Sequence, residues 1–100
     1  MKMAEFLSSI DEGEEPTAEW TTELKALWWC KKGNWAKAHD LAQDAGSSDG
    51  DWVHAHLHRV EGDLGNAGYW YSRAGRKQGA QSFEQEWKEI TAEIISSFDR

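Results

Sequence analysis

The chain has 100 residues, 11 of them basic and 18 acidic, which gives a formal net charge of −7 at pH 7. This length fits one domain, residues 1–100. The negative charge argues against nucleic acid and anionic membranes as partners, because both repel it. No apolar run approaches the roughly 18 residues of a membrane span, and the acidic N-terminus lacks the apolar centre of a signal peptide. With a single cysteine, we expect a protein of the reducing cytoplasm.

The apolar residues are of an unusual kind. Leu, Ile, Val and Phe number only 15, whereas there are seven Trp. Each buried Trp removes roughly 150–250 Å² from water, so we expect a folded core built from Trp and Ala. Val, Ile and Thr together number ten, too few for a well-populated sheet. The composition therefore predicts an all-α fold, with about five to six helices.

The first helix is predicted over residues 3–10, where apolar side chains recur every three or four positions. An acidic linker with the only proline follows at 11–16. Thr17 is placed to cap the second helix, and Trp20 is expected on its apolar stripe. This helix is apolar on two sides, which is typical of a helix between neighbours. Gly33 is expected to end it.

Three more helices are predicted from caps and turn glycines. Asn34 is placed to cap a helix over 35–45. Ser48 and Asp51 stand in capping-box spacing before a helix over about 52–61. Asp63 is expected to cap a helix over 64–74, and Ser82 with Gln85 marks the start of a final helix ending near residue 98.

Two segments of the chain repeat one another at an offset of 29 residues, with 24–46 aligned on 53–75. The matches are turn glycines, caps and small residues, which is the signature of a helix–turn–helix repeat. The runs GNWAKAHDLAQDA (33–45) and GDLGNAGYWYSRA (62–74) resemble the second half of a tetratricopeptide repeat. The resemblance covers about half of the chain.

This resemblance implies antiparallel helical hairpins arranged as an α–α superhelix, and a protein or peptide as the partner. The sequence departs from the family in its shorter period, in having only two units, and in Thr22 and Asp51, which stand where a large aromatic residue is expected. The implied division is an N-terminal helix with its acidic linker at 1–16, hairpins at 17–46 and 48–75, and a capping helix at 82–98.

A narrower resemblance covers residues 52–76. This run is similar to a signature W-H-A-x-x-H-R-x-E-x-D-x-x-N-A-x-Y-W found in small bacterial and fungal proteins without an established activity. The resemblance supports a fold and a candidate surface, and it implies no reaction.

One face of the predicted helix 52–61 carries the polar residues of interest. His54, His58 and Glu61 share this face, and a His pair at i, i+4 is half of a metal site. Glu61 or Asp51 is a candidate third ligand. The alternative is that the histidines are buried and bonded to neighbouring carboxylates or tyrosines. No other cofactor is indicated.

A second polar face lies on the predicted helix 64–74. If the two helices pair, the two faces form a cluster that suits a carboxylate, a phosphate or a peptide terminus. The alternative is a polar network between helices that binds nothing. The candidate binding residues, with Arg59 included, are His54, His58, Arg59, Glu61, Asn66, Tyr69 and Arg73.

The leading functional hypothesis is a non-enzymatic interaction module that binds a protein or peptide or pairs as a homodimer. Trp29 and Trp52 lie off the main apolar stripes, so each either packs on a neighbouring repeat or forms an aromatic binding patch. Catalysis finds little support, because no serine or cysteine stands in a recognisable activated setting. Cys30 beside Lys31 suggests a lowered thiol pKa, although a small core thiol is the simpler interpretation.

Overall fold

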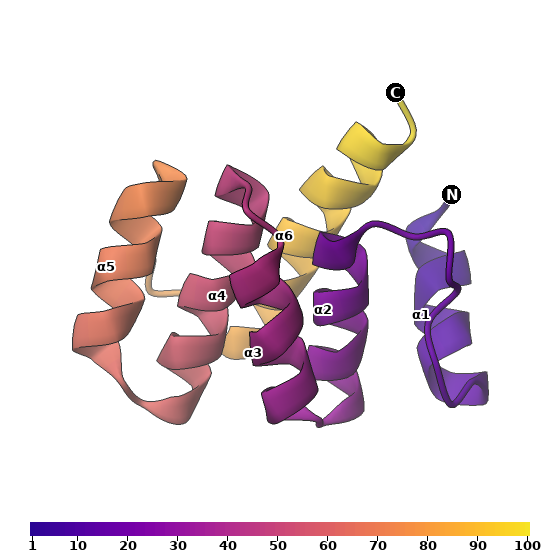
Figure 1. Cartoon of the computed structure of the whole chain (residues 1–100), viewed down its shortest axis with the longest axis horizontal. Helices are drawn as coiled ribbons and strands as arrows, with labels where there is room; N and C mark the ends of the chain where they lie inside the picture. Colours follow the sequence, from indigo (N-terminus) through magenta and orange to yellow (C-terminus); the bar gives the residue numbers. More distant parts are fainter.

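A computed structural model describes all 100 residues and is all-helical, with no strand. The helices run side by side in the order α5, α4, α3, α2, α1 across Figure 1, and α6 crosses behind α4 and α2. The six helices are α1 (Met3–Glu12), α2 (Thr22–Lys32), α3 (Trp35–Asp44), α4 (Ser48–Glu61), α5 (Leu64–Ala74) and α6 (Phe83–Phe98). None of them is long and apolar enough to cross a lipid bilayer.

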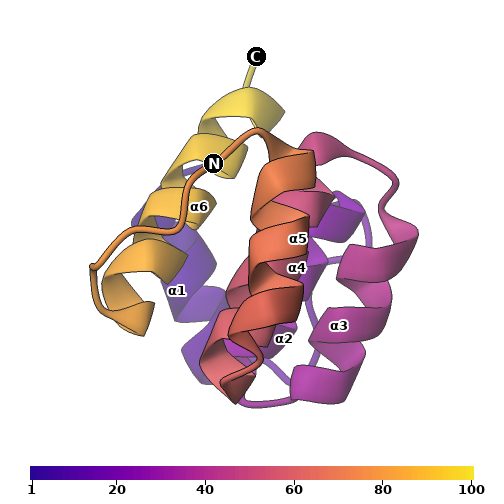
Figure 2. The same ribbon diagram turned by 90° about the vertical axis from the view of Figure 1, so that its left-hand side faces the viewer.

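The two central helices are α2 and α4. Each packs against its successor in the chain, against the other and against α6, while α3 also packs on α4. Figure 2 shows α6 and α3 on opposite sides of α4. The expectation that α2 lies between neighbours is confirmed. The helix α4 is more enclosed still, since every residue from Trp52 to Arg59 is buried.

The core follows the composition. Eighteen buried apolar residues form one cluster, which includes Trp28, Trp52 and Trp87. Four alanines, Ala26, Ala38, Ala55 and Ala67, are fully buried. Small residues let helix backbones approach closely, and the large indole rings fill the remaining space.

Most predicted helix ends are confirmed. Asn34, Asp63 and Ser82 each accept a hydrogen bond from the backbone N–H three residues on, at 3.1, 3.2 and 3.1 Å. Gly33 and Gly62 end α2 and α4 in the left-handed conformation, with φ of 93° and 88°. Sequence spacing located these ends because caps and turn glycines act through local geometry.

The prediction for the start of the second helix is wrong. Thr17 lies in a turn, and α2 begins at Thr22, where Thr21 Oγ1 accepts from the Leu24 N–H at 3.3 Å. Trp20 is outside the helix, and its ring packs on Phe6 of α1 with centroids 5.1 Å apart. This contact joins the segment before α2 to α1.

The start of α4 was also predicted too late. Ser47 is the cap, accepting from the Gly50 N–H at 2.9 Å, and Ser48 is already helical. Gly50 lies inside the first turn of α4. A Cβ atom there would stand 2.6 Å from the Ala45 Cβ, so glycine is required where the end of α3 meets the start of α4.

Candidate metal centre

Three histidines from two helices meet between α3 and α4. His54 and His58 lie one turn apart on α4 with ring centroids 4.8 Å apart, and His39 of α3 lies 4.6 Å from His54 and 5.3 Å from His58. One ligand nitrogen from each ring can be chosen so that all lie within 4.8 Å of one another. The three rings therefore form one compact cluster.

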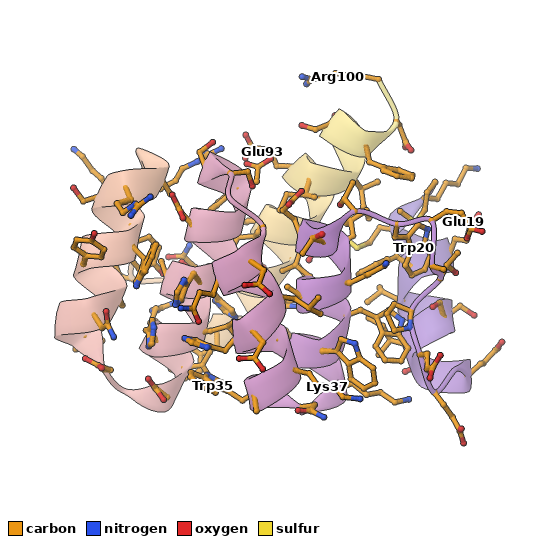
Figure 3. The ribbon with its side chains drawn as sticks, viewed as in Figure 1. Glu19, Trp20, Trp35, Lys37, Glu93 and Arg100 are labelled. Carbon is orange, nitrogen blue, oxygen red and sulfur yellow. The ribbon has the colours of Figure 1, made fainter.

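Local sequence explains why these rings converge. In α3, His39 follows Trp35 by one turn and stacks on its ring at 4.8 Å. The Trp35 Nε1–H donates to the carbonyl of Leu57 in α4 at 2.9 Å. This bond fixes α3 against α4, so that His39 faces the pair on α4. Figure 3 shows Trp35 at one end of α3, among the side chains that fill the space beside α4.

The cluster is largely shielded from solvent. His54 and His58 are 2% and 6% exposed, while the His39 side chain keeps 22% of its surface accessible. On the far side, the ring of Trp70 in α5 lies flat on His54, with centroids 3.9 Å apart. The accessible surface of the cluster therefore lies mainly on His39.

The hydrogen bonds of the cluster leave it incomplete. Nε2 of His54 and Nε2 of His39 are 3.0 Å apart, so one of them donates and the other accepts. His58 Nδ1 bonds to Glu61 Oε1 at 2.8 Å. His54 Nδ1 is the only fully buried side-chain nitrogen or oxygen of the chain without a hydrogen-bond partner. Such a group costs free energy in the protein alone.

Burial also controls the charge of the cluster. Burial, with help from nearby His39, His58 and Arg73, lowers the pKa of His54 to about 4. At neutral pH this imidazole is uncharged, which is the form that binds a metal ion.

The predicted polar face of α5 lies elsewhere. Asn66, Tyr69 and Arg73 are exposed, and Trp70 stands between them and the histidines. The Arg73 side chain bonds to the Tyr69 hydroxyl at 3.5 Å and lies 3.6 Å from Asp51. The candidate residues on α4 and α5 therefore form two groups rather than one pocket.

Arg59 belongs to a different cluster, on the opposite side of α4. There the buried carboxylate of Glu86 in α6 accepts from Arg59 Nη1 at 3.2 Å, from His56 Nδ1 at 2.5 Å and from the Tyr71 hydroxyl at 2.5 Å. Burial alone would raise the pKa of Glu86, but the bonds from His56, Tyr71 and Arg59 hold it below its usual value. Burial and the bond to Glu86 raise the pKa of Tyr71.

The two candidate surface tryptophans pack within the fold. Trp52 is 7% exposed and lies under the Arg76 guanidinium, 3.9 Å from the ring centroid. Trp29 is half-buried, meets Trp28 edge-on at 4.9 Å and is covered by the Lys37 ammonium at 4.2 Å. Neither forms an open aromatic patch.

Sequence reasoning missed His39 as a member of the cluster and Glu86 as a buried charge. Both had a signal. His39 lies one turn after Trp35 on the apolar stripe of its helix, and Glu86 lies three residues after Phe83 on the apolar stripe of the last helix. A charged or titratable residue on a packing stripe must find polar partners on another element.

A scan against protein-family models found no match to this chain, and searches of curated proteins and of solved structures found no similar protein.

Proposed function

We propose that this protein binds a divalent metal ion of the zinc class through His39, His54 and His58. The observation that carries the proposal is the convergence of three imidazoles whose ligand nitrogens lie within 4.8 Å of one another. Zinc sites with three histidines leave the fourth tetrahedral position to water or a ligand. The partial exposure of His39 provides that open side.

The surroundings of the rings support a metal site. Metal-bound histidines commonly donate their second nitrogen to a carboxylate, which orients the ring. Glu61 holds His58 Nδ1 in this way and leaves Nε2 of His58 to the ion. We therefore assign Glu61 an orienting role rather than the ligand role expected from the sequence. Because His39 belongs to α3, the ion would also tie α3 to α4.

The test is a titration of Zn²⁺ into chelator-treated protein, in which isothermal titration calorimetry measures the affinity and the stoichiometry. We expect one ion per chain, and with Co²⁺ the visible absorption of a tetrahedral complex. His39→Gln removes one ligand from a partly exposed position, so the fold survives and the affinity falls by more than about 100-fold. Asp44→Asn, an exposed change on the same helix, is the matched control.

Two further variants separate a metal site from a structural network. Glu61→Gln should weaken Zn²⁺ binding by about 10-fold or more, as loss of an orienting partner does elsewhere. His58→Ala should abolish binding; because His58 is 6% exposed, it should also lower the stability of the metal-free protein, which is measured in parallel. Unchanged Zn²⁺ affinity in His39→Gln contradicts the proposal. A native protein that binds no Zn²⁺ also contradicts it, and a large loss of stability in His58→Ala would then show that the histidines have a structural role alone.

A second candidate function is binding to a protein partner or to a second copy of this chain. The resemblance of α2–α3 and α4–α5 to tetratricopeptide hairpins implies this function. The supporting observation is the outer face of α5, a helix that packs on α4 alone. It exposes Leu64 and Tyr69 at 58% and 55%. Light scattering on the native protein and on Tyr69→Lys tests for a homodimer; a monomer at all concentrations contradicts the self-pairing.

A further inference from the structure

A pocket opens on the side of α4 opposite the histidine cluster. It has a volume of about 230 Å³ and lies between α2, α4 and the start of α6. Its walls are the side chains of Val60, Phe83 and Trp87, with Cys30 and His56 also lining it. An apolar cavity of about 150 Å³ is known to hold benzene in another protein, so this pocket has room for a single six-membered ring.

The pocket contains one buried polar group with an unused nitrogen. His56 is 2% exposed and its Nδ1 bonds to Glu86 at 2.5 Å, but its Nε2 has no bond within the protein. Among the fully buried side-chain nitrogens and oxygens of the chain, only His54 Nδ1 lacks a hydrogen-bond partner. Since His56 Nε2 also lacks a partner, it is not fully buried. The space that it faces is the pocket, which His56 lines.

The bond to Glu86 sets the hydrogen-bonding character of that nitrogen. The Glu86 carboxylate, which also pairs with Arg59 at 3.2 Å, only accepts, so the proton of this bond lies on His56 Nδ1. With its proton on Nδ1 and donated to Glu86, His56 presents the lone pair of Nε2 to the pocket. The pocket thus offers one acceptor among apolar walls.

The rim carries no free charge for a ligand. Lys31 and Glu84 both line the pocket, and their charged atoms lie 3.7 Å apart. The Lys31 ammonium also stands 5.3 Å from the centre of the Trp87 ring. The two charges offset one another, so the rim favours a neutral occupant.

We propose that this pocket binds a neutral, single-ring phenol-like molecule, whose ring packs between Phe83 and Trp87 and whose hydroxyl donates to His56 Nε2. Small-molecule sites are typically apolar with a few placed polar groups, and this pocket has that form. The site is distinct from the proposed metal centre and independent of it, since His56 and His54 face opposite sides of α4.

The first experiment compares two ligands on the native chain. The probe 4-fluorophenol has a hydroxyl donor, and 4-fluoroanisole carries a methyl ether in its place. Titration followed by ¹⁹F NMR should show 4-fluorophenol binding about five-fold or more tightly, the effect of one net hydrogen bond. Equal affinities, or tighter binding of 4-fluoroanisole, overturn the acceptor role of His56, and absence of binding overturns the site.

Indole signals report where the probe binds. The Trp87 Nε1–H, bonded to the Leu27 carbonyl at 3.0 Å, belongs to the pocket wall. The Trp35 Nε1–H belongs to the histidine cluster. Saturation with 4-fluorophenol should shift the Trp87 indole signal and leave that of Trp35 unchanged. The opposite pattern places the probe outside the pocket and overturns the proposal.

A matched pair of variants tests the wall. Phe83 and Phe98 stand at the two ends of α6 and are 47% and 38% exposed, so replacement of either spares the core. Phe83→Ala should weaken 4-fluorophenol binding several-fold, whereas Phe98→Ala should leave it unchanged. Equal effects of the two changes contradict binding in this pocket.

Discussion

Trp70 lies flat on His54, with ring centroids 3.9 Å apart and an angle of 20° between the planes. The indole covers the imidazole from the α5 side and excludes water from it. Hydration stabilises the charged imidazolium form. The contact with Trp70 therefore contributes to the burial that lowers the pKa of His54 to about 4.

Replacement of this cover should therefore raise the pKa of His54. We expect Trp70→Leu to raise it by about one unit, toward its ordinary value near 6.5, because water then reaches the ring. The measurement is an NMR titration of the imidazole signals in metal-free protein. Leu64→Ala, an exposed change on the same helix, should leave the pKa of His54 in place.

The metal-free protein should lose stability in mild acid. The folded pKa of His54 is about 4, below its ordinary value of 6.5, so between these pH values the unfolded chain binds more protons. The free energy of unfolding is then highest above pH 6.5 and falls by about 3 kcal/mol as the pH drops to 4. Urea unfolding across this range measures the loss. In His54→Leu the decline should be shallower; an equal decline would assign it to other groups.

Glu86 should be the most costly single carboxylate to neutralise. Glu86→Gln keeps the size of the side chain but leaves the buried Arg59 guanidinium without a counter-charge, which costs about 3–5 kcal/mol. Chemical denaturation measures the change. Glu89→Gln, one turn away on the exposed side of α6, is the control and should cost less than about 0.5 kcal/mol.

Cys30 should react slowly. From the sequence, a small core thiol was the simpler interpretation and activation by Lys31 the alternative. Burial outweighs the Lys31 charge and raises the pKa of Cys30 to about 11. The thiolate is the reactive form, so alkylation by iodoacetamide at pH 8 should be about 100-fold slower than for the unfolded chain. A folded protein that alkylates as fast as the unfolded chain would show that the thiol is not buried in this way.

The two serines before α4 should differ in their effect on stability. Ser47 caps the helix, so Ser47→Ala should cost about 1 kcal/mol in thermal or chemical unfolding. Ser48 is exposed in the first turn, and Ser48→Ala should change stability little. The reverse order would restore the capping box expected from the sequence.

These serines illustrate what the sequence can predict. The helices, their glycine ends and three of the caps follow from spacing, because each depends on residues within one turn. The starts of α2 and α4 do not, since they depend on contacts with another helix, Trp20 on Phe6 and Gly50 beside Ala45.

The candidate site divides in the same way. The pair His54 and His58 was visible because helical spacing places both on one face. His39 reaches them only through the packing of α3 on α4, which no local pattern specifies. The polar face of α5 was placed correctly on its own helix, but the pairing of helices sets Trp70, rather than Arg73, against His54.

The uninterrupted burial of Trp52–Arg59 has a consequence for how this protein tolerates change. An ordinary surface helix tolerates substitutions on its solvent-exposed face, but eight successive residues of α4 have no such face. Mutational tolerance should therefore fall to its minimum over two full turns of one helix. Substitutions should be tolerated best on the outer face of α5 and in the loop before α6, so sequence variation should concentrate at these edges of the fold.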